Sequence, residues 1–433
     1  MKFLALLLIA IGQPVFATTD TLALKEYTEL KVDAELRPRF ELRNGYRMLR
    51  NDTTSAAGFV SARTRLNLQY DHPKYAMVFS IQDIRVWGED DPRSTTGTIQ
   101  LFEGYFDLKF KYGLKLRVGR QRLMYDNQRL FAQNDWRQNA NAHDGLRLSW
   151  KGKQLESEWS SFFNQSSEQV FGTAFNTPGF STYKFLGVHY LKATLSERFT
   201  LTTLNAVDGF QDLVDKEHVH FRFTSGGRLE WKKNNWYLTL ASYYQYGRTI
   251  SNQQISAFYA QPEIKWERKE KAFVRLGAEL LSGQNVYDTL DKTYRSFVPL
   301  YGVAHRFNGY MDQFTSFPND LNSRGLFNPY LFLSITLNKK LSVRTDVHAF
   351  FTMTEVRDTD GAALNALMAI ENDWLLNYKM NDATNLEWGV CWLVPERSMV
   401  MVKGDGVDGK LNYWTYVMLT FRPTLFTSKK ELK

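Results

Sequence analysis

The sequence predicts an all-β protein, a transmembrane antiparallel β-barrel of about 18 strands with short periplasmic turns and long extracellular loops. Strand-length segments carry one apolar and one charged face, and their connections alternate between short turns and long loops. No segment beyond the N-terminal run approaches the roughly 20 apolar residues of a spanning helix. Because lipid cannot satisfy backbone polar groups, only helices and closed barrels cross a membrane.

The chain begins with a segment typical of export. Residues 1–17 hold one lysine and an apolar run that breaks at Gly12 and Pro14, and they end on the small residue Ala17. We expect residues 1–17 to be a signal peptide and residues 18–433 to form one barrel domain, since no linker or composition shift divides them.

The first strand predicted, residues 29–43, shows the two faces most clearly. One parity is apolar from Leu30 to Leu42, and every residue of the other parity is charged, from Glu29 to Arg43. Alternate side chains of a strand lie on opposite faces. We therefore expect the apolar face to meet lipid and the charged face to line a water-filled bore. The same alternation recurs in residues 59–70, 218–232, 272–280 and 341–351.

Eight short polar turns predict sixteen strands, and a first and a last strand bring the total to eighteen. The turns are residues 71–74, 112–113, 152–154, 196–198, 233–235, 268–271, 338–340 and 381–384. The long connections include residues 44–58, 88–98, 124–142, 165–182, 283–324 and 353–371. A soluble β-sandwich also alternates, but aromatic residues crowd beside the short turns, as in the interfacial girdle of a barrel.

Two segments predict irregular pairing, and one predicts a helix. The apolar parity changes between Ile81 and Ile84, which indicates a β-bulge, and Pro38 cannot donate a hydrogen bond to its neighbouring strand. Residues 360–372 combine helix-forming side chains with an N-cap candidate, Asp360, and predict a short loop helix.

Arginine dominates the inward parity. These arginines are Arg37, Arg39, Arg43, Arg63, Arg65, Arg117, Arg147, Arg222, Arg228, Arg275 and Arg344, and the carboxylates Glu35, Glu41, Glu230, Glu279 and Asp346 share the face. Arginine stays charged and binds carboxylates through two donors, so such a lumen favours anionic solutes. The alternative is that the arginines pair internally and stiffen the wall.

Residues 117–150 contain a series of short motifs: Gly119-Arg120-Gln121, Arg129-Leu130, Asp135-Trp136, and Asp144-Gly145 followed by Leu146-Arg147-Leu148. Together these motifs resemble the alginate-export family of outer-membrane porins. Further matches are residues 62–70, 82–88, 280–283, 297–314 and 372–395, so the resemblance spans nearly the whole mature chain.

The resemblance implies an eighteen-strand barrel whose electropositive pore passes an acidic polysaccharide outward. By position it implies that Arg63, Arg65, Arg85, Arg120, Arg129, Asp144 and Arg147 line the pore. Two departures weaken the transfer of alginate itself as the substrate. His143 stands where the family often places an aromatic residue, and residues 424–433 follow the last strand.

The remaining candidate sites are less specific. His143 and Asp144 are adjacent but alternate in face, and no partnered nucleophile accompanies them, so we predict no catalytic residue. His218 and His220 share a face but have no third ligand, so we predict no metal or cofactor. Residues 305–314 lie in the longest loop, and Arg306 and Asp312 are candidates for an inward constriction loop; an ordinary outer loop is the alternative.

Together these patterns predict a channel in the outer membrane of a Gram-negative bacterium. The expected partners are outer-membrane lipid, an anionic saccharide or small anion as solute, and periplasmic export proteins. No nucleic-acid motif accompanies the net charge of +8. The alternatives are a barrel enzyme acting on lipid or envelope polymer and the barrel component of a secretion or uptake complex.

Overall fold

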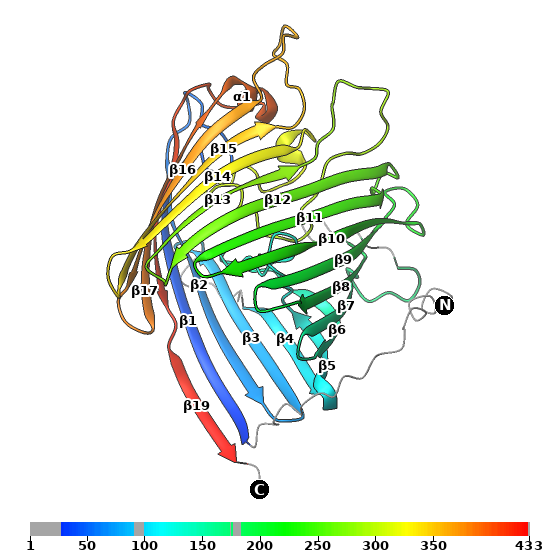
Figure 1. Ribbon diagram of the computed structural model, residues 1–433, viewed down its shortest axis with the longest axis vertical. Helices are drawn as coiled ribbons and strands as arrows, with labels where there is room; N and C mark the ends of the chain where they lie inside the picture. The colour runs from blue at the N-terminus through cyan, green and yellow to red at the C-terminus, as the bar shows by residue number, and fades with distance from the viewer. Residues whose placement is uncertain (1–26, 91–98, 174, 176–182, 432–433) are drawn as a thin grey trace.

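The computed structural model describes residues 27–90, 99–173, 175 and 183–431. One antiparallel sheet winds through the described chain (Figure 1). Its strands are β1 (Tyr27–Asn44), β2 (Ala57–Asp71), β3 (Tyr75–Val86), β4 (Gln100–Lys109), β5 (Leu114–Gln121), β6 (His143–Lys151), β7 (Leu155–Phe163), β8 (Phe185–Thr194), β9 (Phe199–Gln211), β10 (Val219–Lys233), β11 (Trp236–Arg248), β12 (Gln254–Arg268), β13 (Ala272–Leu281), β14 (Leu326–Thr336), β15 (Leu341–Thr352), β16 (Leu367–Lys379), β17 (Thr384–Pro395), β18 (Asn412–Phe421) and β19 (Thr424–Glu431).

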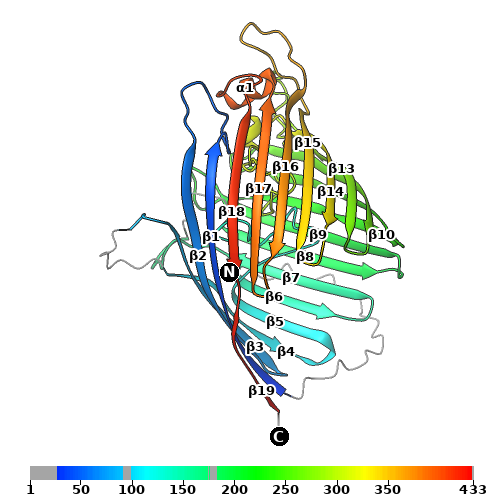
Figure 2. The same cartoon turned by 90° about the vertical axis from the view of Figure 1, so that its left-hand side faces the viewer.

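The sheet closes on its first strand. β1 pairs with β2 along one edge and with both β18 and β19 along the other (Figure 2). β18 and β19 are two halves of one bent strand, interrupted at Arg422 and Pro423, so the barrel has eighteen strand positions. The prediction of an eighteen-strand antiparallel barrel is confirmed.

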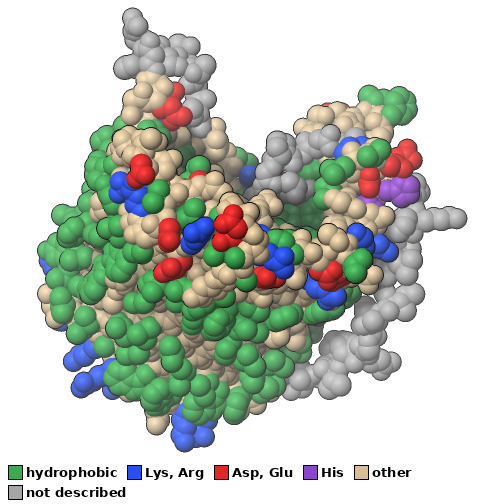
Figure 3. Space-filling model, turned by 90° about the horizontal axis from the view of Figure 1, so that it is seen from above, with side chains coloured by type: hydrophobic (Ala, Val, Ile, Leu, Met, Phe, Trp, Pro, Cys, Tyr) green, Lys and Arg blue, Asp and Glu red, His purple; other side chains and the backbone are tan. Residues whose placement is uncertain are grey.

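The inside-out distribution of side chains shows why this sheet suits a membrane. In β1, Leu36 is 46% exposed and Phe40 is 48% exposed, whereas the intervening Arg37 and Arg39 are buried. Hydrophobic side chains cover the outer wall, and charged side chains appear along the rim at the loop end (Figure 3). Outward apolar and inward polar residues are the pattern of a barrel in lipid.

The predicted turns and the alternation place the strands correctly. Each of the eight predicted short turns separates two paired strands of the sheet. At Pro38 the pairing of β1 with β18 is interrupted without a change of register, and a register shift occurs instead between Val32 and Asp33, against β19. A bulge lies between Ser80 and Ile81, but β4 supplies its extra residue, while β3 pairs regularly with β2.

The predicted helix over residues 360–372 is wrong. Asp358 accepts the backbone N–H groups of Asp360 and Ala362 in a tight turn, and β16 begins at Leu367. The described chain instead forms one short α-helix, α1 (Arg397–Lys403), and two 3-10 turns, η1 (Lys111–Gly113) and η2 (Asn319–Leu321). No described helix is long and apolar enough to cross a membrane. The predicted signal peptide lies outside the described residues.

Candidate pore and constriction

Two long loops fold into the barrel and pack against each other. We call residues 122–142 the first inward loop and residues 282–325 the second inward loop. Phe131 of the first forms a parallel bridge with Tyr301 of the second, and both rings are buried. At this contact the second loop has Gly302, where a larger residue would not fit, because a Cβ there would lie 1.8 Å from the carbonyl oxygen of Arg129. The two loops therefore form one packed unit inside the wall.

Arginines of β1 and β2 hold the first inward loop. Arg37 donates from Nη1 to the carbonyl oxygen of Asp135 at 2.7 Å and from Nη2 to that of Arg137 at 2.6 Å. Arg63 donates from Nη1 to Asp135 Oδ1 at 2.9 Å and to the carbonyl oxygen of Gln138 at 3.0 Å. These inward side chains are covered by the loop, so they bind protein oxygen atoms and do not face open water.

A carboxylate of the loop is surrounded by four guanidinium groups. Asp135 Oδ1 lies 2.9 Å from Arg63 and 3.3 Å from Arg65, and its Oδ2 lies 3.4 Å from Arg422 and 3.9 Å from Arg37. The only other carboxylate of this group among the described residues is Glu35, which accepts from Arg63 Nε at 2.9 Å and from Arg422 Nε at 2.7 Å. We call these residues the Asp135 cluster.

Arg39 joins the cluster to an aromatic group. It pairs with Glu41 at 2.9 Å and lies over the ring of Trp136, 4.6 Å from its centroid. Trp136 stacks on His305 of the second inward loop with centroids 4.4 Å apart. His305 pairs with Asp312 at 2.7 Å. The candidate Asp312 thus lies inside the barrel as a buried anchor of the second inward loop.

The second inward loop is also fixed to β13 and β16. Arg129, from the first loop, donates to Glu279 at 2.8 Å, to the carbonyl oxygen of Val303 at 3.1 Å and to Asn308 at 2.9 Å. Glu371 accepts the backbone N–H of Met311 at 2.8 Å. Gly309 (φ +80°) permits this approach, because a Cβ there would lie 2.3 Å from Glu371 Oε1.

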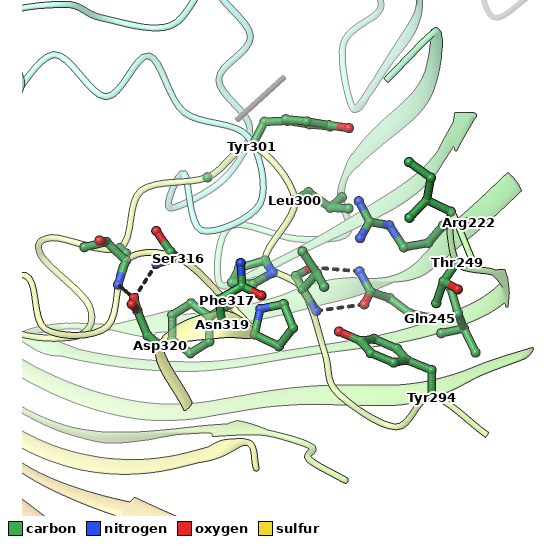
Figure 4. Close-up of a pocket in the computed structure, with 18 of the residues that line it drawn as sticks. Arg222, Gln245, Thr249, Tyr294, Leu300, Tyr301, Ser316, Phe317, Asn319 and Asp320 are labelled. Atoms are coloured by element: carbon green, nitrogen blue, oxygen red, sulfur yellow. Dashed lines mark hydrogen bonds between the residues drawn. The ribbon is translucent and has the colours of Figure 1, made fainter. Parts of the chain in front are cut away.

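Two cavities lie on either side of these loops. The extracellular cavity has a volume of about 820 Å³ and is lined by Arg222, Tyr294, Tyr301 and Phe317, among others (Figure 4). Its charged lining residues are five arginines, against two aspartates: Arg47, Arg129, Arg137, Arg222 and Arg248, with Asp312 and Asp320.

The periplasmic cavity has a volume of about 560 Å³. Its lining includes Lys31 and Gln69 near the short-turn end of the barrel, as well as Asp135 and Arg422. Asp135 thus faces the periplasmic cavity, while Arg137, two residues further on, faces the extracellular one. The first inward loop separates the two cavities.

The remaining wall arginines are paired with carboxylates. Arg222 pairs with Asp208, and the other pairs are Arg117–Asp107 at 2.7 Å, Arg147–Glu158 at 3.4 Å, Arg275–Glu263 at 3.7 Å and Arg344–Asp346, with nitrogen and oxygen 2.6 Å apart. Arg137, Arg248 and Arg306 have no carboxylate partner among the described residues. Burial, with the charges of Arg275 and Arg344, lowers the pKa of Arg306.

The comparison with known proteins agrees with this architecture. The sequence profile named Alginate export matches residues 28–373. The chain belongs to the alginate export family. The comparison with curated protein sequences found no match to this chain. Similar solved structures include Acinetobacter baumannii OccAB1, with a TM-score of 0.60 and 12% identity over 92% of this chain and 97% of that chain. Acinetobacter baumannii OccAB4 has a TM-score of 0.58 and 14% identity over 93% of this chain and 98% of that chain. Pseudomonas aeruginosa OpdK, solved with vanillate, has a TM-score of 0.59 and 10% identity over 91% of this chain and 98% of that chain.

Three residues that the family resemblance placed in the pore lie on the outer face. Arg120 pairs in register with Asp144, and Val118 with the exposed Leu146, so all four share the lipid-facing side. Arg120 and Asp144 form an ion pair of 2.6 Å at the loop end of β5 and β6. Arg85 lies opposite Ala62, one residue out of phase with the inward Arg63, and pairs with Asp83.

The histidine candidates have polar partners of other kinds. His143 is buried and its Nδ1 lies 2.8 Å from the hydroxyl of Tyr183. His220 lies 2.8 Å from Asp212, and His218 lies 2.6 Å from Asp215. The hydrogen bond from His220, with two backbone N–H groups, lowers the pKa of Asp212 to about 2. Within the described ranges, no group of three or more His, Cys, Asp or Glu residues could hold a metal ion.

Several residues that shape the lumen were not predicted from the sequence. Asp135, Gln138 and Arg137 belong to a loop, where no alternation indicates which side chains point inward. Arg422 lies at the break between β18 and β19, where Pro423 interrupts the strand. Alternation in the last strand could have indicated that Arg422 faces the lumen: Phe421 is exposed on the outer face, and the next residue of a strand points to the opposite face.

Proposed function

We propose that this outer-membrane channel passes anionic solutes, acidic sugars in particular. The observation that carries the proposal is the extracellular cavity, whose lining holds five arginines and two aspartates. Fixed guanidinium groups lower the electrostatic cost of bringing an anion into the bore. Because Arg47, Arg129 and Arg222 already have carboxylate partners, the preference depends mainly on Arg137 and Arg248.

The shape of the lumen favours small solutes in the state described. A volume of about 820 Å³ lies within the range of about 300–1,000 Å³ typical of small-molecule sites. Tyr294, Tyr301 and Phe317 provide ring faces beside Arg222, an arrangement suited to a ring that carries a carboxylate. The vanillate in the OpdK structure is a solute of this chemical kind. A longer acidic polysaccharide requires the inward loops to move.

The test is the reversal potential of the purified protein in a planar bilayer under a potassium chloride gradient. We expect preference for chloride, and block by glucuronate added to the extracellular side, but not by glucose. Arg137→Gln/Arg248→Gln should reduce the anion preference, by up to about fivefold per charge, since unit charges 4 Å apart in water interact by about 1 kcal/mol. Arg198→Gln, in an exposed periplasmic turn, is the matched control.

A cation-selective or unselective wild-type channel would refute the proposal. An unchanged preference in the double variant would remove these two arginines from the filter. Association with periplasmic export proteins stays a prediction, which co-purification from membranes can check.

A further inference from the structure

The Asp135 cluster has the chemistry of a carboxylate-binding site. Four guanidinium groups, from Arg37, Arg63, Arg65 and Arg422, surround one carboxylate, and each oxygen of Asp135 lies near two of them. Without Asp135, the described residues of the cluster would leave four arginines against Glu35 alone. Such an excess of buried positive charge is costly unless an anion neutralises it.

The loop offers these arginines the same groups that an acidic sugar would offer. Besides the Asp135 carboxylate, the carbonyl oxygens of Asp135, Arg137 and Gln138 accept hydrogen bonds from Arg37 and Arg63. Gln138 Oε1 accepts from Arg37 Nε at 3.1 Å. A uronate presents a carboxylate flanked by neutral oxygen atoms, so it can replace these acceptors in kind.

The cluster is open to solute from one side. The Asp135 side chain is 22% exposed and that of Arg422 is 52% exposed. Both line the periplasmic cavity, together with Arg65, Arg122 and Gln133. The opposite side of the loop packs on the second inward loop. Of the Asp135 cluster, a solute arriving from the periplasm therefore meets Asp135 and Arg422 first.

We propose that Asp135 is an internal ligand of a carboxylate site formed by Arg37, Arg63, Arg65 and Arg422, and that an acidic solute entering from the periplasm displaces it and releases the first inward loop. The exchange needs no net change of charge in the cluster, because one carboxylate replaces another. The solute class rests on the proposed function; the self-occupied site rests on the contacts above.

The first experiment compares the wild-type protein with Asp135→Asn in planar bilayers containing only potassium chloride. Asparagine keeps the shape and removes the charge that four arginines share. We expect the mean current to rise about tenfold or more, since a hydrogen bond to a charged group contributes about 1.5–3 kcal/mol. Asp144→Asn is the matched control, because Asp144 lies on the outer face, and its current should equal that of the wild type.

The second experiment adds trigalacturonate to one side of the bilayer and then to the other. The wild-type current should rise when the solute reaches the periplasmic side only, maltotriose should have no effect, and Asp135→Asn should not respond. Arg422→Gln, which keeps Asp135 but removes the most accessible guanidinium, should weaken the response to trigalacturonate. This variant decides the question if Asp135→Asn does not fold.

Unchanged basal current in Asp135→Asn would overturn the proposal, as would block of the wild type by trigalacturonate from the periplasmic side. An undiminished response in Arg422→Gln would also overturn it. The two proposals fail separately. Lack of anion preference in the wild type refutes the proposed function, whereas an anion-selective channel that ignores Asp135→Asn refutes only the internal ligand.

Discussion

Replacing Arg129 with methionine should loosen the two inward loops without unfolding the barrel. The side chain is buried between the loops and β13, and its guanidinium bonds to Glu279, Asn308 and the carbonyl oxygen of Val303. Breaking a buried ion pair by removing one partner costs about 3–5 kcal/mol. Glu279 keeps hydrogen bonds from Tyr259 at 2.5 Å and Asn308 at 2.9 Å, so we expect the lower end of that range, about 3 kcal/mol.

Hydrogen exchange can measure this loss at individual amides. The N–H of Tyr301 donates to the carbonyl oxygen of Leu130 at 2.9 Å, and that of Val303 donates to Gln128 at 3.0 Å. Both bonds join the two loops, so both amides exchange when the loops separate. A loss of about 3 kcal/mol in opening free energy corresponds to roughly 100-fold faster exchange.

The control is Arg117→Met, which breaks the wall pair with Asp107 and contacts neither loop. It should leave exchange at Tyr301 and Val303 unchanged. Arg129→Met/Glu279→Gln should recover part of the protection, since no buried charge then stays unpaired. Wild-type exchange at both amides in Arg129→Met would refute the reasoning, because it would show that apolar packing alone holds the loops together.

Three further predictions concern charge and lipid contact. Burial alone would raise the pKa of Asp135, but the charges of Arg63 and Arg37 outweigh burial and keep the pKa below its ordinary value of 3.8. The ionised carboxylate therefore anchors the loop at any pH above that value, and the anchor is lost only as the pH falls below it. Conductance should accordingly be constant between about pH 5 and 8, and a rise within that window would contradict the assignment. Arg120→Gln and Asp144→Asn should not change the reversal potential, because both side chains lie outside the lumen; a shift of either would return them to it. Phe40→Arg, facing lipid opposite Val417 near the middle of β18, should reduce the free energy of unfolding into urea by about 2–4 kcal/mol, and a cost near zero would argue against membrane depth there.

The wall of this barrel could be predicted because its information is local. Alternation fixes the face of each side chain, and a short turn needs only its own few residues, so the eight turns and eighteen strand positions follow from the sequence. Arg85, Arg120 and Asp144 were misplaced because their position in the pore was taken from the family resemblance and not from the alternation. In residues 114–121, the phase of Val118 alone puts Arg120 outside, and only the family resemblance placed it in the pore.

The inward loops could not be predicted by the same means. Their residues have no alternation, and the partners of Arg37 and Arg63 are about 70 to 100 positions away in the chain. The helix predicted for residues 360–372 failed for a related reason. Helix-forming residues there are overridden by pairing with β15 and β17, which places Met368, Glu371 and Asp373 inside the barrel.

Arginine in the lumen therefore has two roles that composition alone cannot separate. Arg63 bonds simultaneously to Glu35, to Asp135 and to two carbonyl oxygens, and lysine, with three donors on a single nitrogen, could not span this geometry. Such arginines are needed to hold a loop whatever the solute. Arg137, Arg248 and Arg306 have no carboxylate partner among the described residues, although Arg248 donates to the carbonyl oxygen of Asn252 and Arg306 to that of Asn127. If selectivity follows these few groups and not the total number of arginines, they act on the solute, and the paired arginines hold the structure.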